Sequence, residues 1–200
     1  MEFFRRAAGT PGKLGVLAGT FNPPTRAHLA LARAALALVD EVLFVLPREF
    51  PHKTYEEAGF AERLAVLEAA LAGEPRCSIG ATEKGLFIDI ARECRAAYGD
   101  AELYFLCGRD AAERVVNWDY GRAGAIAEQV REYQLLVAAR RGRYEPPSEL
   151  RERIHPLPVE EGYDEISATE VRERIRRGQP WEHLVPEAVV ALARELYAGA

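Results

Sequence analysis

A loop that joins a short apolar run to a helix-like stretch carries the residue types of a phosphate site. Residues 15–28 read Gly-Val-Leu-Ala-Gly-Thr-Phe-Asn-Pro-Pro-Thr-Arg-Ala-His. Gly19 permits a ligand to approach the backbone closely. Thr25 is a typical N-cap, which places His28 in the first helical turn, beside free N–H groups and the positive end of the helix dipole. The loop therefore predicts an anion site, although a histidine in this position also occurs as a packed or capping residue.

A second candidate anion site lies near the C-terminus. Ser167 precedes a helix-like stretch, and Ser167 with Glu170 forms a Ser-x-x-Glu capping box, which needs no function to exist. Thr169 in the first turn and Arg172 one turn later add a hydroxyl and a guanidinium to the free amides of that helix end. Two anion sites in one chain indicate a ligand with several phosphates.

The elements that must position these residues are strands and helices in alternation. Buried strands are predicted at 13–18, 42–46, 103–107 and 135–139, with a weaker candidate at 76–80. Helices are predicted at 26–39, 56–72, 88–98 and, less regularly, 111–133. This alternation predicts an α/β fold, a doubly wound Rossmann-like parallel sheet with helices on both faces. Ligands of such sheets bind beyond the carboxyl ends of the strands.

The two ends of the chain differ from this pattern. We expect residues 1–12 to be a flexible leader, and residues 13–200 to be a single domain. After a loop at 141–147 the sequence predicts a short helix, a strand at 154–159, and helices at 168–177 and 186–197. Residues 165–200 are therefore expected to form a C-terminal helical extension that completes the site.

Composition limits the classes of function. The chain has 200 residues, of which 48% are hydrophobic and 28% charged, as in globular proteins that are neither disordered nor embedded in a membrane. The net charge of −5 argues against a nucleic-acid partner, so an anion site must be local. Cys77, Cys94 and Cys107 are odd in number and lack metal-ligand spacing, which favours buried thiols in the reducing cytoplasm.

Taken together, the two loops resemble the nucleotidyltransferase superfamily that carries a His/Thr-x-x-His motif and an Ile-Ser-x-Thr-x-x-Arg motif. The first motif corresponds to Thr25-x-x-His28, after Gly-Thr-Phe-Asn-Pro at 19–23, and the second to residues 166–172. Within the superfamily the chain most resembles the nicotinate (nicotinamide) mononucleotide adenylyltransferases, from Leu14 to about Tyr197. Three further matches are Pro51-His52-Lys53, Gly108-Arg109-Asp110 with Trp118 eight residues after the aspartate, and the stretch Leu184–Glu187.

The resemblance implies transfer of AMP from ATP to a pyridine mononucleotide, with release of pyrophosphate, in NAD biosynthesis. It implies catalytic roles for Thr25, His28 and Arg172. It implies ATP binding by Gly19, Thr20, Phe21, Gly108, Asp110, Ser167 and Thr169, and acceptor binding by Lys53, Phe87 and Trp118. Mg²⁺ would be bound mainly through the ATP phosphates, with no metal ligands from the protein. The implied partners are these two substrates, without nucleic acid or membrane.

One departure leaves the acceptor open. Gly85-Leu86-Phe87-Ile88-Asp89 stands where nicotinate-specific bacterial enzymes usually have Ser-Tyr-Thr-x-Asp, so the choice between nicotinate and nicotinamide is not decided. Two alternatives stay open. One is an adenylyltransferase or cytidylyltransferase of the same superfamily with another acceptor, such as phosphopantetheine, and the other is a non-catalytic nucleotide-binding module. The sequence leaves the oligomeric state open as well, a homo-oligomer included.

Overall fold

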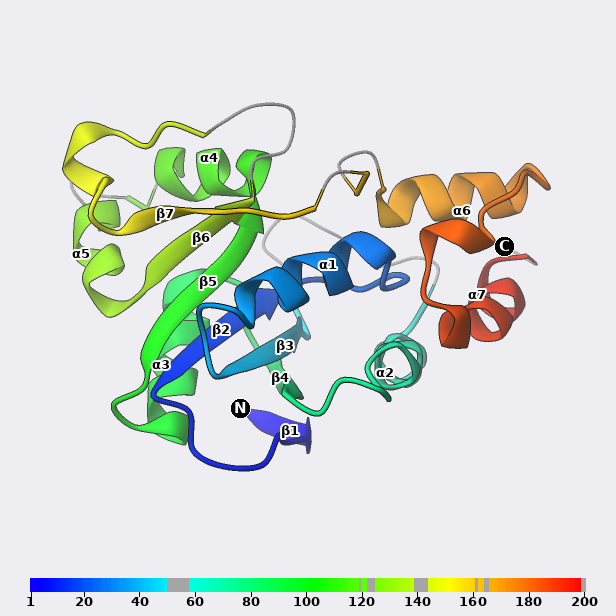
Figure 1. Ribbon diagram of the computed structural model, residues 1–200, viewed down its shortest axis with the longest axis horizontal. Helices are drawn as coiled ribbons and strands as arrows, with labels where there is room; N and C mark the ends of the chain where they lie inside the picture. The colour runs from blue at the N-terminus through cyan, green and yellow to red at the C-terminus, as the bar shows by residue number, and fades with distance from the viewer. Residues whose placement is uncertain are drawn as a thin grey trace.

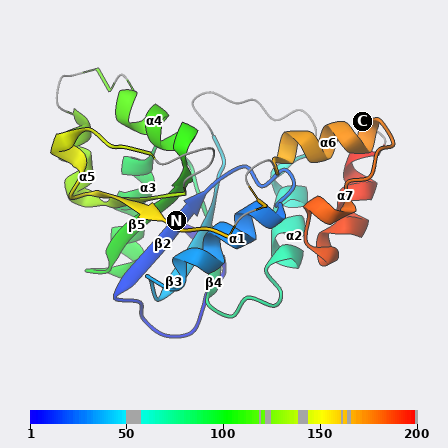
Figure 2. The same cartoon turned by 45° about the horizontal axis from the view of Figure 1, so that its top comes forward.

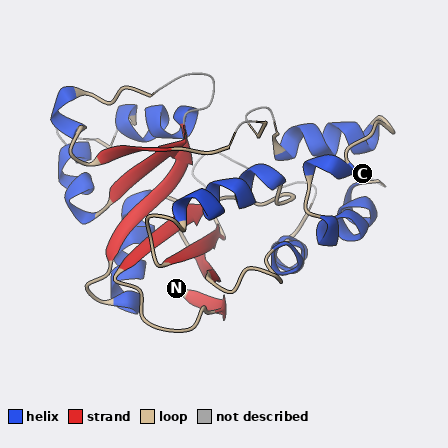
Figure 3. Ribbon diagram, in the orientation of Figure 1, coloured by secondary structure: helices blue, strands red, loops and turns tan. Residues whose placement is uncertain are grey.

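The structure, a computed structural model, describes residues 1–49, 58–118, 120–121, 125–138, 144–160, 162–163 and 166–198. The described residues form a seven-stranded sheet with helices against both of its faces (Figure 1; Figure 3). The strands are β1 (Glu2–Arg5), β2 (Lys13–Ala18), β3 (Glu41–Pro47), β4 (Cys77–Thr82), β5 (Glu102–Gly108), β6 (Gln134–Ala138) and β7 (Ile154–Leu157). All neighbouring strands are parallel except β1 and β4, which are antiparallel.

The strand order, β1-β4-β3-β2-β5-β6-β7, places β2 in the middle of the sheet. From β2 the chain winds outward through β3 and β4, and then returns to the other side of β2 to add β5, β6 and β7. Such a reversal opens a crevice at the carboxyl ends of the two central strands, here β2 and β5. The doubly wound parallel sheet predicted from the sequence is confirmed.

The sheet is buried on both faces, which explains why its strands read as continuous apolar runs. Along β3, Val42, Phe44 and Leu46 contribute to the core on one face, and Leu43 and Val45 to the core on the other. The core on the first face includes residues of α1 (Arg26–Ala35), α2 (Phe60–Ala70), α6 (Ala168–Arg176) and α7 (Val190–Tyr197). The second is covered by α3 (Phe87–Tyr98), α4 (Arg109–Asn117) and α5 (Ala125–Glu132).

The C-terminal helices gather at one end of the molecule. Figure 2 shows α6 and α7 beside α2, and contacts join α7 to both helices. Short 3₁₀ helices lie at Ser148–Leu150, before β7, and at Glu182–Leu184 and Glu187–Val189, before α7. Within the described part of the chain, no helix has the length and apolar character that a membrane crossing needs.

The prediction of a flexible leader at residues 1–12 is wrong for Glu2–Arg5. These residues form β1, which pairs with β4 at the edge of the sheet. Two contacts explain the order: the N-terminal amino group lies 2.7 Å from the Glu93 carboxylate, and the ring of Phe3 packs edge-on against Tyr98 with centroids 5.7 Å apart. Residues 2–5 therefore complete one edge of the sheet.

The prediction of one helix over 111–133 is also wrong. Two helices occupy this region, since α4 ends at Asn117 and α5 begins at Ala125. The backbone of Trp118 is extended, with φ −66° and ψ 136°, and Gly121 has a positive φ of 77°. Neither conformation continues an α-helix, so one helix cannot run through these two residues.

Candidate functional site

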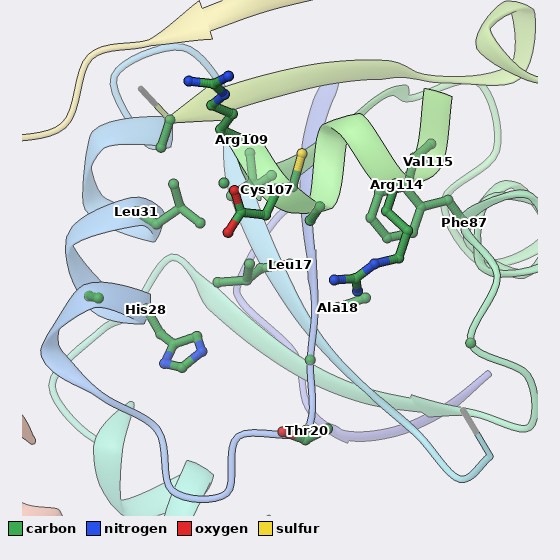
Figure 4. A pocket seen from close by; sticks show the side chains of 18 of the residues that line it. Leu17, Ala18, Thr20, His28, Leu31, Phe87, Cys107, Arg109, Arg114 and Val115 are labelled. Atoms are coloured by element: carbon green, nitrogen blue, oxygen red, sulfur yellow. The ribbon is translucent and has the colours of Figure 1, made fainter. Parts of the chain in front are cut away.

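A cavity of about 430 Å³ lies at the carboxyl ends of β2 and β5 (Figure 4). Its walls come from the loop after β2, the first turns of α1, the start of α3, and the turn from β5 into α4. This is the crevice at which doubly wound sheets bind ligands. The structure brings together here most of the residues predicted for the site: Gly19, Thr20, His28, Phe87, Gly108, Asp110 and Trp118.

The orientation of His28 is fixed by the start of α1. Its Nδ1 accepts a hydrogen bond from the Thr25 N–H at 3.0 Å and lies 2.8 Å from Thr25 Oγ1. Because Nδ1 accepts from a backbone N–H, the ring proton belongs on Nε2, which makes Nε2 a donor. The imidazole lies on the cavity wall in Figure 4, so His28 can donate to an anion inside the cavity. The structure thus places the histidine predicted from the helix start on the wall of the cavity.

Thr25 contributes indirectly. Its side chain is completely buried and is absent from the cavity lining among the described residues, although the resemblance implied a catalytic role for it. Thr25 is the N-cap of α1, with an extended backbone. Its backbone N–H and its hydroxyl both lie next to His28 Nδ1, so Thr25 positions the imidazole.

The loop between β2 and α1 is held in an unusual conformation. Phe21 has a φ of +47°, which is rare for a residue with a large side chain. Its ring is buried between two others, with centroids 5.2 Å from His28 and 5.4 Å from Phe44. A Cβ atom on Gly19 would lie 3.1 Å from the Phe21 ring, so glycine lets that ring fold back under the loop. Strain of this kind persists only where the surroundings over-determine it.

Three side chains that follow the loop in the sequence hold its polar groups. The Asn22 carbonyl accepts from Arg172 Nη1 at 2.6 Å, and Asn22 Oδ1 accepts from the Tyr197 hydroxyl. The Thr20 carbonyl accepts from Arg63 Nη1 at 3.2 Å. Burial raises the pKa of Tyr197 to about 12, so its phenol stays protonated and donates. Arg172 therefore contacts the loop between β2 and α1 by donating to the Asn22 carbonyl, and this bond helps to hold the conformation of the loop.

The wall after β5 is cationic. Arg109 and Arg114 line the cavity together with the Asp110 carboxylate. Arg109 Nε donates to Glu113 Oε1 at 2.8 Å, which binds this guanidinium to its own helix. In Figure 4 the Arg114 side chain runs along the wall toward Ala18, on the β2 side of the cavity. Neither arginine was among the predicted site residues, although Arg109 belongs to the Gly108-Arg109-Asp110 match.

Aromatic side chains line part of the cavity. The Phe87 ring stacks on Phe105 with centroids 4.4 Å apart and an interplanar angle of 26°, and meets Tyr133 edge-on at 6.2 Å. Trp118, at the end of α4, lines the same cavity. Flat apolar surfaces of this kind suit a heteroaromatic ring. The residues Leu86-Phe87 thus supply an aromatic wall where a tyrosine and a threonine were expected from the resemblance.

Some predicted residues lie elsewhere. Ser167 and Thr169 are exposed and line a shallow hollow with Arg174 and Arg177, apart from the main cavity. Ser167 Oγ accepts from the Glu170 N–H at 3.1 Å, as a helix cap does. Lys53, with the Pro51-His52 that precedes it, falls outside the described residues.

Other groups that could add chemistry are few in the part of the chain that is described. It holds no group of three or more His, Cys, Asp or Glu side chains that could bind a metal ion. Cys107 lines the cavity, but burial raises the pKa of its thiol to about 12. Because the thiolate is the nucleophilic form, this cysteine is inert at neutral pH.

Comparison with known proteins identifies the family. Residues 16–174 match the family described as cytidylyltransferase-like. A probable nicotinate-nucleotide adenylyltransferase of Geobacillus thermodenitrificans is 35% identical over 187 residues, which cover 89% of this chain and 82% of that protein. Another, from Thermus thermophilus, is 33% identical over 88% of this chain and 94% of that protein.

Among solved structures, the nicotinic acid mononucleotide adenylyltransferase of Plasmodium falciparum complexed with NaAD shares the fold. The TM-score is 0.68 at 16% identity, over 92% of this chain and 95% of that one. The resemblance inferred from the two sequence motifs is therefore confirmed. The chain belongs to the cytidylyltransferase-like family and, within it, to the nicotinate-nucleotide adenylyltransferase group.

Proposed function

We propose that this protein transfers the AMP moiety of ATP to a pyridine mononucleotide and releases pyrophosphate. The observation that carries the proposal is the continuity of the cavity, which runs from the phosphate-binding features around His28 to the aromatic wall of Phe87 and Trp118. A nucleotide phosphate and a heteroaromatic ring can therefore be held in the same cavity. The names of the relatives support the same reaction.

In this reaction an oxygen of the mononucleotide phosphate attacks the α-phosphorus of ATP. The new P–O bond forms as the bond to the β,γ-pyrophosphate breaks, and the pyrophosphate leaves with the bonding electrons. Both reactants are anions, so the protein must bring them together and offset the charge on the oxygens of the transferred group. No protein nucleophile is needed, which agrees with the neutral thiol of Cys107.

His28 supplies the donor on the phosphate side. With its proton on Nε2, the imidazole can hydrogen-bond a phosphate oxygen without competing for the Thr25 N–H, which is bound at Nδ1. Gly19 and Thr20 let the backbone of the loop approach the same phosphate. Arg172 holds the end of this loop through the Asn22 carbonyl. In our proposal, Ser167 and Thr169 at the start of α6 bind the outer phosphates of ATP, which extend past the loop.

The opposite half of the cavity would hold the acceptor. We assign the pyridine ring to the aromatic side chains of Phe87 and Trp118, while Asp110 remains our prediction for a ribose hydroxyl of ATP. Arg114 places a cation on this wall, which favours an acceptor that carries a carboxylate besides its phosphate. Nicotinate mononucleotide is therefore the acceptor we expect to be preferred over the nicotinamide form. Lys53 remains our prediction for the acceptor phosphate.

Magnesium would enter as part of the Mg-ATP substrate. The cavity offers a carboxylate, Asp110, and an imidazole, His28, without a preformed cage of oxygen ligands among its described lining. Mg²⁺ is commonly bound in this way, through substrate phosphates with few protein ligands. The ion would neutralise part of the phosphate charge, while the side chains named above orient the two nucleotides.

The test is pyrophosphate release from Mg-ATP by the purified protein. Nicotinate mononucleotide, nicotinamide mononucleotide and phosphopantetheine are supplied in separate reactions, each with a control in which EDTA removes the metal. We expect release with a pyridine mononucleotide, faster for the nicotinate form, and loss of release with EDTA. Release with phosphopantetheine and neither pyridine nucleotide would refute the acceptor assignment. Binding of ATP without release for any acceptor would indicate a nucleotide-binding module.

A further inference from the structure

A charged residue is buried in the helix that supports the first loop. The inward face of α2 consists of Arg63, Val66, Leu67 and Ala70, and Arg63 is only 2% exposed. Burying a guanidinium costs free energy unless polar partners compensate it. No part of the reaction described above uses Arg63, so its position requires another explanation.

One partner of Arg63 is the backbone of the loop between β2 and α1. Its Nη1 donates to the carbonyl oxygen of Thr20 at 3.2 Å, across 43 positions of sequence. The guanidinium lies 5.9 Å from the centroid of the Phe60 ring. The charges of Arg172 and Arg63 both act on the buried phenol of Tyr197 and oppose the rise of its pKa that burial causes. Two guanidinium groups therefore each donate to a carbonyl of the loop between β2 and α1, Arg63 to Thr20 and Arg172 to Asn22.

The contact with Thr20 determines the direction of one peptide group. In a trans peptide the C=O of one residue and the N–H of the next point in opposite directions. Since the Thr20 carbonyl points to the buried Arg63, the Phe21 N–H points away from the buried layer. The positive φ of Phe21 directly follows this peptide, and Thr20 itself lines the cavity. The strained conformation and the buried arginine are thus parts of one arrangement.

We propose that Arg63 is a positioning residue, which holds the Thr20–Phe21 peptide so that the Phe21 N–H donates to the phosphoryl group being transferred. A donor aimed at charge that develops during the reaction raises the rate more than it tightens substrate binding. Arg63 itself touches neither substrate. This inference rests on the proposed function.

The test compares two variants of Arg63 with a matched control. Arg63→Met keeps an unbranched apolar chain but is shorter and removes the donors, and Arg63→Lys keeps a charge and a donor. The control is Arg76→Met, because Arg76 donates to the carbonyls of Leu36, Val39 and Asp40 at the opposite end of β3. For Arg63→Met we expect kcat to fall roughly 10²- to 10³-fold, the usual effect of losing one such donor. The KM for ATP should change little, Arg63→Lys should recover part of kcat, and Arg76→Met should leave kcat unchanged.

A second measurement follows the peptide directly. In protein labelled with ¹⁵N, the Phe21 amide signal should shift when a non-hydrolysable ATP analogue is added to the wild type. The same shift should be lost in Arg63→Met, and it should be intermediate in size in Arg63→Lys. This readout needs no turnover, so it tests the inference separately from the proposed function. A wild type that releases no pyrophosphate with either pyridine nucleotide would refute the proposed function, whereas the Phe21 shift tests the role of Arg63. A folded Arg63→Met with wild-type kcat, or with an unchanged Phe21 shift, would overturn the inference. A fall in kcat that matches the unfolded fraction of the variant would overturn it too.

Discussion

The joint between the last helix and the first loop allows a quantitative prediction. Tyr197 is 1% exposed and Asn22 is 6% exposed, and the Tyr197 hydroxyl donates to Asn22 Oδ1. The substitution Tyr197→Phe removes the donor and leaves a buried acceptor, which costs about 1–3 kcal/mol. A chain of 200 residues loses roughly 2–4 °C of Tm for each kcal/mol. The Tm should therefore fall by about 2–12 °C.

The assay is urea and thermal unfolding followed by tryptophan fluorescence. Tyr104→Phe is the control, because the Tyr104 hydroxyl donates at 2.7 Å to the exposed Glu102 carboxylate, and its removal should change stability by no more than about 0.5 kcal/mol. Since Asn22 is part of the phosphate loop, Tyr197→Phe should also lower kcat. Equal unfolding free energies for the two variants would refute the reasoning, because the buried bond would then contribute nothing beyond an exposed one.

Three other predictions concern the site and the core. His28→Asn keeps an acceptor for the Thr25 N–H but loses the Nε2 donor, so kcat should fall about 10²- to 10³-fold in the pyrophosphate assay; an unchanged kcat would remove this donor from the mechanism. Arg172→Ala should raise the KM for ATP and lower kcat, because the Asn22 carbonyl loses its guanidinium. If both constants stay at their wild-type values, Arg172 plays no part. The free energy of unfolding should fall as the pH rises from about 9 toward 12, because burial raises the pKa of Cys77, Cys94 and Cys107 from 9.0 to about 12. Between about pH 9 and 12 the thiols of the unfolded state lose their protons before those of the folded state, which favours unfolding. A free energy of unfolding that rises with pH over this range, measured by urea titration, would contradict the prediction.

The central strands could be predicted from the sequence because both faces of the sheet are covered. The prediction for 13–18 coincides with β2, and that for 103–107 lies within β5. Edge elements gave weaker signals. Strand β1 has only four residues, and its partner β4 lies far along the chain, so its pairing could not be read from a local pattern. The split between α4 and α5 depends on backbone angles near Gly121, which the apolar periodicity does not reveal.

In the site too, contacts between residues close in the sequence could be predicted, and contacts between distant residues could not. His28 could be predicted because its partner, the N-cap Thr25, is three residues away. Arg63 and Tyr197 could not, because their partners in the loop are 43 and 175 positions distant. One signal was available for Arg63: it is a charged residue on the face of α2 that otherwise carries apolar residues. The face on which Thr169 lies is likewise set by how α6 packs, and no motif specifies that.

The central claim is that one cavity holds both nucleotides while AMP passes between them. The most direct measurement follows radioactive phosphorus from ATP in the presence of nicotinate mononucleotide, with the products separated by chromatography. Label in the α-phosphate should appear in the dinucleotide, label in the γ-phosphate should appear in pyrophosphate, and both should form in equal amounts and slow together in His28→Asn. Release of γ-label without α-label in a dinucleotide would mean hydrolysis of ATP, and it would contradict the account.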